Sequence, residues 1–177
     1  MATKLLASFL AHLKRLFESL VMPPAPPPDD YWKDLADKIY SESLKSVSKD
    51  ITPEDRVPDE YSCVQQITTI LRRVLPTFPI MDSTIVLNSY LSKSPQWKKV
   101  TIPRHGDVHV FVTNSGNGTV KNGHAFICGK FISEDGTRWL MSNDSRNGQW
   151  SVNYTIASAN KYYSVKGGMS PHYYRIV

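Results

Sequence analysis

The hydrophobic pattern of this chain changes its period once, near Pro95, and that change limits the folds that it can adopt. Before that point, the apolar residues of segment 61–76 recur every three or four positions, which predicts a helix that ends at Pro76. After it, apolar and polar residues alternate, as they do along 105–113. A chain with helices first and strands afterwards indicates an α+β fold with an antiparallel sheet.

The remaining elements follow from the same two periods. Further helices are expected over 31–50 and Asp82–Leu91. Besides 105–113, the segments that alternate like strands are 124–133, 137–144, 149–156 and 172–177. Turn signals separate them at 114–118, Asp135-Gly136 and Asn147-Gly148, so the strands are expected to form an antiparallel sheet.

Residues 1–22 have an apolar stripe at helical spacing, formed by Leu6, Leu10, Leu13, Phe17 and Leu20. Charged residues interrupt this stretch at Lys14, Arg15 and Glu18, which argues against a signal peptide and against a membrane-spanning helix. The pattern predicts a separate amphipathic helix. It can bind its own domain, a second copy, a virion partner or a membrane surface.

A proline-rich segment follows at 23–30 and contains five of the chain's 12 prolines. Proline fixes φ and donates no backbone hydrogen bond, so this segment is expected to be an extended linker. The sequence therefore predicts three parts, which are the amphipathic helix 1–22, the linker 23–30 and a single domain over 31–177.

Composition excludes several classes of protein. Hydrophobic residues make up 41% of the chain and charged residues 21%, which is ordinary for a globular domain and excludes collagen-like or wholly disordered chains. The 2 cysteines are too few for a disulfide scaffold. The net charge of +5 favours anionic partners without choosing among them.

Cys63 is the first candidate for chemistry. Ser62-x-x-Gln65 fits a capping box, which makes Ser62 the N-cap and Cys63 the first helical residue. Unpaired N–H groups and the helix dipole at that position favour the thiolate and can hold an oxyanion. The alternative is a small buried hydrophobic residue beneath Tyr61.

A cysteine nucleophile needs a base and a group that orients the base. His124 follows the turn 121–123 and opens a strand, from which it can reach a neighbouring helix end. Asn143 and Asp144 end the next strand. Because strand side chains alternate between faces, one of the two can face His124, and the register decides which.

With these residues in this order, the chain resembles the CHAP family of papain-like cell-wall hydrolases. The resemblance covers about 59–177, and three segments carry it: Tyr61–Val64, Arg104–Val110 and Asn122–Ile127. Ser142–Ser145 with Gly148 and Trp150 looks like small phage-encoded members. The resemblance implies a papain-like fold and hydrolysis of amide bonds in peptidoglycan through an acyl-enzyme, without a cofactor. It implies either a phage endolysin, present in the host cytoplasm before release to the cell wall, or a lysin carried in the virion.

Carried over to this sequence, the resemblance makes Cys63 the nucleophile and His124 the general base and later acid. Asn143 would orient the imidazole, with Asp144 as its rival, and Tyr61 would add a donor near the oxyanion. The other cysteine, Cys128, lies within a strand and is expected in the core.

Three alternatives remain at the level of sequence. A zinc site could use His105, His109 and His124 with Asp107 or Cys128, although no helical ligand pair supports it. Basic residues among the aromatic residues of the later half could bind single-stranded nucleic acid or wall polymer, although no specific nucleic acid is predicted. A structural virion module could use the same fold without catalysis.

Overall fold

The computed structural model describes residues 29–52, 58, 62–113 and 123–177. The amphipathic helix predicted over 1–22, most of the linker and Tyr61 lie outside these described residues. Within them, no helix combines the length and apolar character needed to cross a membrane. The predicted division into three parts stays a prediction.

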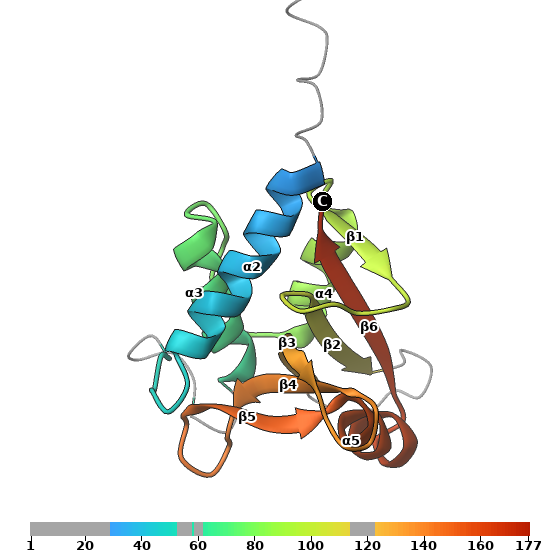
Figure 1. Cartoon of the computed structure of the whole chain (residues 1–177). Coiled ribbons are helices and arrows are strands. Elements are labelled where there is room, and N and C mark those ends of the chain that lie inside the picture. The colour runs from blue at the N-terminus through green and yellow to red at the C-terminus, as the bar shows by residue number, and fades with distance from the viewer. Residues whose placement is uncertain (1–28, 53–57, 59–61, 114–122) are drawn as a thin grey trace, which may run out of the picture.

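Helices precede the sheet, as predicted, and the chain has an α+β fold (Figure 1). The longer helices are α2 (Asp29–Lys45), α3 (Cys63–Val74) and α4 (Thr84–Lys93). The strands are β1 (Trp97–Val100), β2 (Val108–Thr113), β3 (His124–Ile132), β4 (Arg138–Asn143), β5 (Trp150–Thr155) and β6 (Met169–Ile176). A short α5 (Ile156–Ala159) runs into a π-helix, η2 (Asn160–Lys166), before β6. The papain-like arrangement stays a prediction.

The six strands form one sheet in the order β1-β6-β2-β3-β4-β5, and every neighbouring pair is antiparallel. The last strand, β6, returns to a place next to the edge strand β1 and pairs with both β1 and β2. β3 lies between β2 and β4, with Phe111 opposite His124 and Ile127 opposite Met141. The first residues of β3 therefore lie at one end of the sheet.

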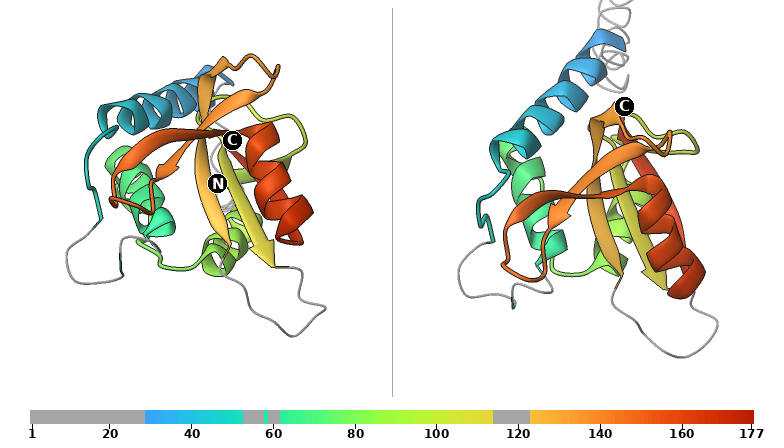
Figure 2. Two further views of the ribbon diagram at one scale, coloured as in Figure 1. Left: turned by 90° about the horizontal axis from the view of Figure 1, so that it is seen from below. Right: turned by 60° about the horizontal axis from the view of Figure 1, so that its bottom comes forward.

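Helices cover both faces of the sheet (Figure 2). On one face, α2, α3 and α4 bury a core that includes Ile39, Ile67, Leu87, Val110 and Ile127. On the other face, α5 and η2 cover a smaller core formed by Phe111, Phe126, Cys128, Leu140, Ala159 and Met169. Cys128 is buried in that smaller core, which confirms its predicted place.

α3 begins at Cys63 and ends at Val74, just before Pro76, as its apolar spacing predicts. Ser62 is the N-cap, but the predicted capping box is wrong. The Ser62 hydroxyl accepts hydrogen bonds from Asn143 and Gln66, and the Gln65 side chain donates to Asp82. Contacts with Gln66 and with the distant Asn143 and Asp82 thus replace the capping box.

Three elements differ from the sequence expectations. α2 begins at Asp29, inside the predicted linker, and ends at Lys45. Strand β1 was not predicted, because it has only four residues, of which Trp97 is buried and Lys98 and Lys99 are exposed. The α5–η2 segment was not predicted either, because helical and strand periods are not distinct in it.

Candidate functional site

Cys63 lies at the start of α3, where its thiol receives hydrogen bonds from three backbone N–H groups. These belong to Cys63 itself, to Val64 and to Ala125. The first two are among the N–H groups that a helix leaves unpaired at its N-terminus. An anion formed at or next to the sulfur would therefore find donors already in place.

The contact from Ala125 brings the helix start to the start of β3, because Ala125 directly follows His124. The approach depends on Gly123. A Cβ at that position would collide with the backbone oxygen of Phe111 and lie 2.7 Å from Thr84 Oγ1. A side chain there would push β3 away from β2, and His124 would move with it.

The thiol is neutral in this environment. Cys63 is only 4% exposed, and burial raises its pKa to about 11, which outweighs the N–H donors that lower it. The N–H groups at the helix start favour the thiolate, as expected, but burial outweighs them and the thiol of the resting protein is protonated. A neutral thiol needs a base that takes its proton as it attacks.

His124 has a defined hydrogen-bond partner on the next strand. Its Nε2 lies 3.0 Å from Ser142 Oγ. The Ser142 hydroxyl donates its single proton to Asn153 Oδ1 at 3.2 Å or to the Asn143 carbonyl at 3.3 Å. When the hydroxyl donates to either of these oxygens, Nε2 is the nitrogen that donates to Ser142, and Nδ1 keeps the lone pair needed by a base.

Aromatic rings enclose the imidazole on the face of the sheet covered by η2. Tyr163 stacks on His124 with ring centroids 5.1 Å apart and planes 8° apart, and Phe126 lies at 4.6 Å. Burial lowers the pKa of His124 to about 4, so the imidazole is neutral at pH 7. Burial also raises the pKa of Tyr163, whose side chain is hydrogen-bonded to Tyr154 and lies within electrostatic reach of Cys63.

The predicted orienting residues take other partners. Asn143 Nδ2 donates to Ser62 Oγ at 3.3 Å, so Asn143 connects β4 to the residue before Cys63. Asp144 pairs with Arg146 at 2.6 Å, and this hydrogen bonding lowers the pKa of Asp144 to about 2. Among the described residues, Ser142 makes the side-chain hydrogen bond to His124. The predicted donor Tyr61 lies outside the described residues.

The start of α3 is also connected to the turn between β4 and β5. Gln66, buried one turn into the helix, donates from Nε2 to the Gly148 carbonyl and to Ser62 Oγ. Together with the Asn143 contact, these bonds fix the backbone on which the Cys63 and Val64 N–H groups sit.

The other histidines lie elsewhere. His105 pairs with Asp37 of α2 at 2.7 Å. His109 is fully buried against Phe111, Phe126 and Tyr173, and neither of its ring nitrogens has a hydrogen-bond partner in the described part of the chain. The described residues contain no group of three or more potential ligands placed to hold a metal ion.

Sequence reasoning missed Ser142, Asn153, Tyr154 and Tyr163. Both faces of the sheet are buried, so Leu140 and Met141 are apolar neighbours with opposite orientations. Alternation alone could therefore not say which residues of β4 share a face with His124. Leu140 pairs with Cys128, which shares a face of β3 with His124, so Ser142, two residues after Leu140, lies on that face, one residue before the predicted Asn143.

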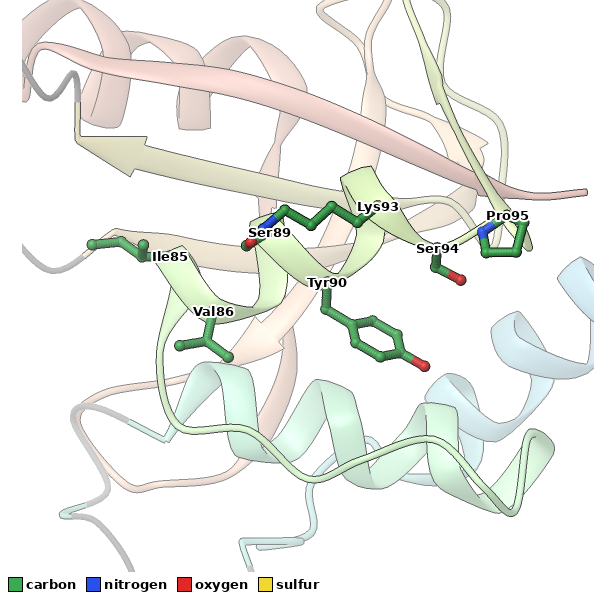
Figure 3. A pocket seen from close by; sticks show the side chains of 7 residues that line it. All are labelled: Ile85, Val86, Ser89, Tyr90, Lys93, Ser94 and Pro95. Atoms are coloured by element: carbon green, nitrogen blue, oxygen red, sulfur yellow. The ribbon is translucent and has the colours of Figure 1, made fainter.

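One surface hollow lies apart from these groups. It has a volume of about 700 Å³ and lies along the outer side of α4 (Figure 3). Its lining includes Ile85, Val86, Tyr90 and Lys93, and neither Cys63 nor His124 contributes to it. The hollow is shallow and mostly apolar, so the candidate site is defined by Cys63 and His124 instead.

The protonation states predict how Cys63 reacts. At pH 8 a thiol with a pKa near 11 is almost entirely protonated, so iodoacetamide should alkylate Cys63 at least about a hundredfold more slowly than free cysteine. The rate should rise steadily as the pH is raised to 10. Mass spectrometry of time points would measure it, with the unfolded protein as control. Fast alkylation that levels off below pH 7 would instead indicate a thiolate–imidazolium pair.

Comparisons with known proteins give little beyond this geometry. No protein-family model and no curated protein sequence matches the chain. Among solved structures, a chain from the type VI native effector-immunity complex Tae3-Tai3 of Ralstonia pickettii aligns with a TM-score of 0.49 and 13% identity. The alignment covers 80% of this chain and 98% of that chain. Function is therefore inferred from the site itself.

Proposed function

We propose that this protein is a cysteine hydrolase that cleaves amide bonds of bacterial peptidoglycan. One observation carries the proposal. The Cys63 thiol receives N–H donors from a helix start and from Ala125, and the residue before Ala125 in β3 is His124, whose Nε2 lies 3.0 Å from Ser142 Oγ. A nucleophile, a base and a third group that orients the base are the parts that acyl transfer requires.

Acylation follows from the protonation states. His124 Nδ1 takes the thiol proton as Cys63 Sγ attacks the carbonyl carbon of the amide. The oxyanion forms beside the N–H groups of Cys63 and Val64, which stabilise its charge. The imidazolium then gives its proton to the leaving amine. The C–N bond breaks, and a thioester to Cys63 remains.

Deacylation uses the same groups in reverse order. Water gives a proton to His124 and attacks the thioester carbonyl, the C–S bond breaks, and the proton returns to the sulfur as the acid product leaves. Throughout, Ser142 accepts from Nε2–H and holds the tautomer, and the stacked Tyr163 holds the plane of the ring.

The choice of peptidoglycan rests on the resemblance of segments 61–64, 104–110 and 122–127 to cell-wall hydrolases of the CHAP family. The net charge of +5 suits an enzyme that works on an anionic wall. We extend the proposal to a phage lysin that acts after release from the host cytoplasm or from the virion.

The test is the loss of turbidity of purified peptidoglycan from which outer membrane and teichoic acid have been removed. Wild-type protein should clear the suspension and release new amino termini, whose sequence identifies the bond. Absence of new amino termini with walls of several peptide types would contradict the proposal. Tight sedimentation with walls that stay intact would favour a non-catalytic binding module.

Ser142 provides a sharper test of the site. Ser142→Ala removes the partner of His124 Nε2, a hydrogen bond to a group that becomes charged during the reaction. We expect kcat to fall about ten- to a hundredfold, with KM nearly unchanged and with an altered pH profile. Asp144→Ala, which loses only the pair with Arg146, should retain activity. The reverse result would return the orienting role to Asp144.

A further inference from the structure

A second surface, at the other end of β3 from His124, has the character of a binding groove. It is a hollow of about 300 Å³ between the end of α2 and the strands β3, β4 and β5. Its lining includes Tyr40, Leu44, Phe131, Trp139 and Val152. We refer to it as the α2 groove. α2 lies beside β3, as Figure 2 shows.

Large apolar side chains of the α2 groove are exposed. Phe131 is 71% exposed, Val152 44%, Leu44 42% and Trp139 37%. A contiguous patch of this kind on a monomer is usually a binding surface. The lining offers few polar side chains, chiefly Lys130 and Tyr40, so an apolar occupant fits it better than a sugar or an anion.

We propose that residues 1–22 of the same chain bind the α2 groove through their apolar stripe. Leu6, Leu10, Leu13, Phe17 and Leu20 recur at the spacing that places them on one face of a helix. Binding of such a face in an apolar groove is a common mode of helix recognition. This inference is independent of the proposed hydrolysis.

The length of the chain allows this contact. Leu44 lies 15 residues after Asp29, or about 22 Å along α2 at 1.5 Å per residue. Residues 23–28, at about 3.1 Å per residue in an extended proline-rich chain, span about 19 Å. Nine further residues, at the rise of the helix that their spacing predicts, bring Leu13 about 14 Å beyond that. Leu13 can therefore reach the groove from the start of α2.

The charges are complementary as well. Segment 1–22 has three basic residues, Lys4, Lys14 and Arg15, against one acidic residue, Glu18, a net side-chain charge of +2. α2 has five acidic and three basic residues, a net charge of −2. Two helices side by side with opposite net charges attract each other, and the attraction weakens with salt.

Site-specific photo-cross-linking in the full-length protein tests the proposal. p-Benzoylphenylalanine would replace Leu13 of the stripe or, as the matched control, Arg15 on the opposite side of the helix. We expect the photoprobe at position 13 to cross-link to residues of the α2 groove. When isotope-labelled and unlabelled protein are mixed, both ends of each cross-link should come from the same chain. The yield from position 15 should be at least about tenfold lower.

Variants of the groove make the result specific. Phe131→Glu and Val152→Glu lie on exposed positions and should lower the adduct yield about tenfold. Ile102→Glu, at a position 77% exposed outside the groove, should not change it.

Adducts elsewhere, or equal yields from positions 13 and 15, would overturn the proposal. Adducts between labelled and unlabelled chains would assign the groove to a second copy. Binding to phosphatidylglycerol vesicles without groove adducts would assign the stripe to a membrane surface.

Discussion

Cys63→Ala is expected to abolish the clearing of purified peptidoglycan, with a rate at least about a thousandfold below that of the wild type. The variant removes the atom that would form the thioester, and no other described side chain could replace the sulfur between the N–H groups of Val64 and Ala125. His124→Ala should have an effect of similar size, because a thiol with a pKa near 11 supplies almost no thiolate without a base.

The chain supplies a matched control for this experiment. Cys128 is buried like Cys63, but it lies in the core between the sheet and η2, so Cys128→Ala should retain clearing activity. Circular dichroism and thermal melting would verify that each variant is folded. A folded Cys63→Ala protein that clears walls at the wild-type rate would exclude the thiol as nucleophile.

Acidification should destabilise the protein strongly because of His109. Burial lowers its pKa to about 3 in the folded protein, whereas the unfolded chain has an ordinary value near 6.5. Between these values the unfolded state binds a proton that the folded state does not, so stability is lost as the pH falls. From pH 7 to pH 4.5 the loss attributable to His109 is about 2–3 kcal/mol. Urea unfolding at several pH values would measure it.

Two variants separate this effect from general acid denaturation. His109→Phe keeps an aromatic ring among Phe111, Phe126 and Tyr173 and should remove about half of the pH dependence, because buried His124, with a pKa lowered to about 4, contributes a loss of similar size. His105→Gln, at the surface beside Asp37, should leave the dependence in place. If His109→Phe loses stability with acid as steeply as the wild type, the buried imidazole is not the cause.

The sequence predicted the elements that have a strong period or a clear stop. α3 could be placed because Val64, Ile67 and Leu71 repeat at helical spacing and Pro76 follows. β1 could not, because four residues carry too little periodicity, and it is held by pairing with β6 from the far end of the chain. The strand order was also beyond prediction, since β6 is inserted between β1 and β2.

The candidate site was predictable to the extent that it depends on local signals. Ser62 marks the helix start and thus Cys63, and the turn before His124 marks the start of a strand. The third group depends on register across a sheet that is buried on both faces, and Ser142 could not be distinguished from Asn143. The protonation states were not predictable, because they follow from burial, which outweighs the helix N-terminus at Cys63.

The polar contacts at the start of α3 have a consequence for cooperativity. Ser62 and Gln66 are bonded to Asn143 and to the Gly148 carbonyl, so the backbone beneath the thiol is attached directly to β4 and to the turn that follows it. Loops that carry reactive groups often open on their own, well below the free energy of global unfolding. Local opening around Cys63 is opposed here, because it would also break the contacts to β4 and to the Gly148 turn. In the proposed hydrolase, this attachment would keep the reacting atoms in place and narrow the range of substrate shapes that the site accepts.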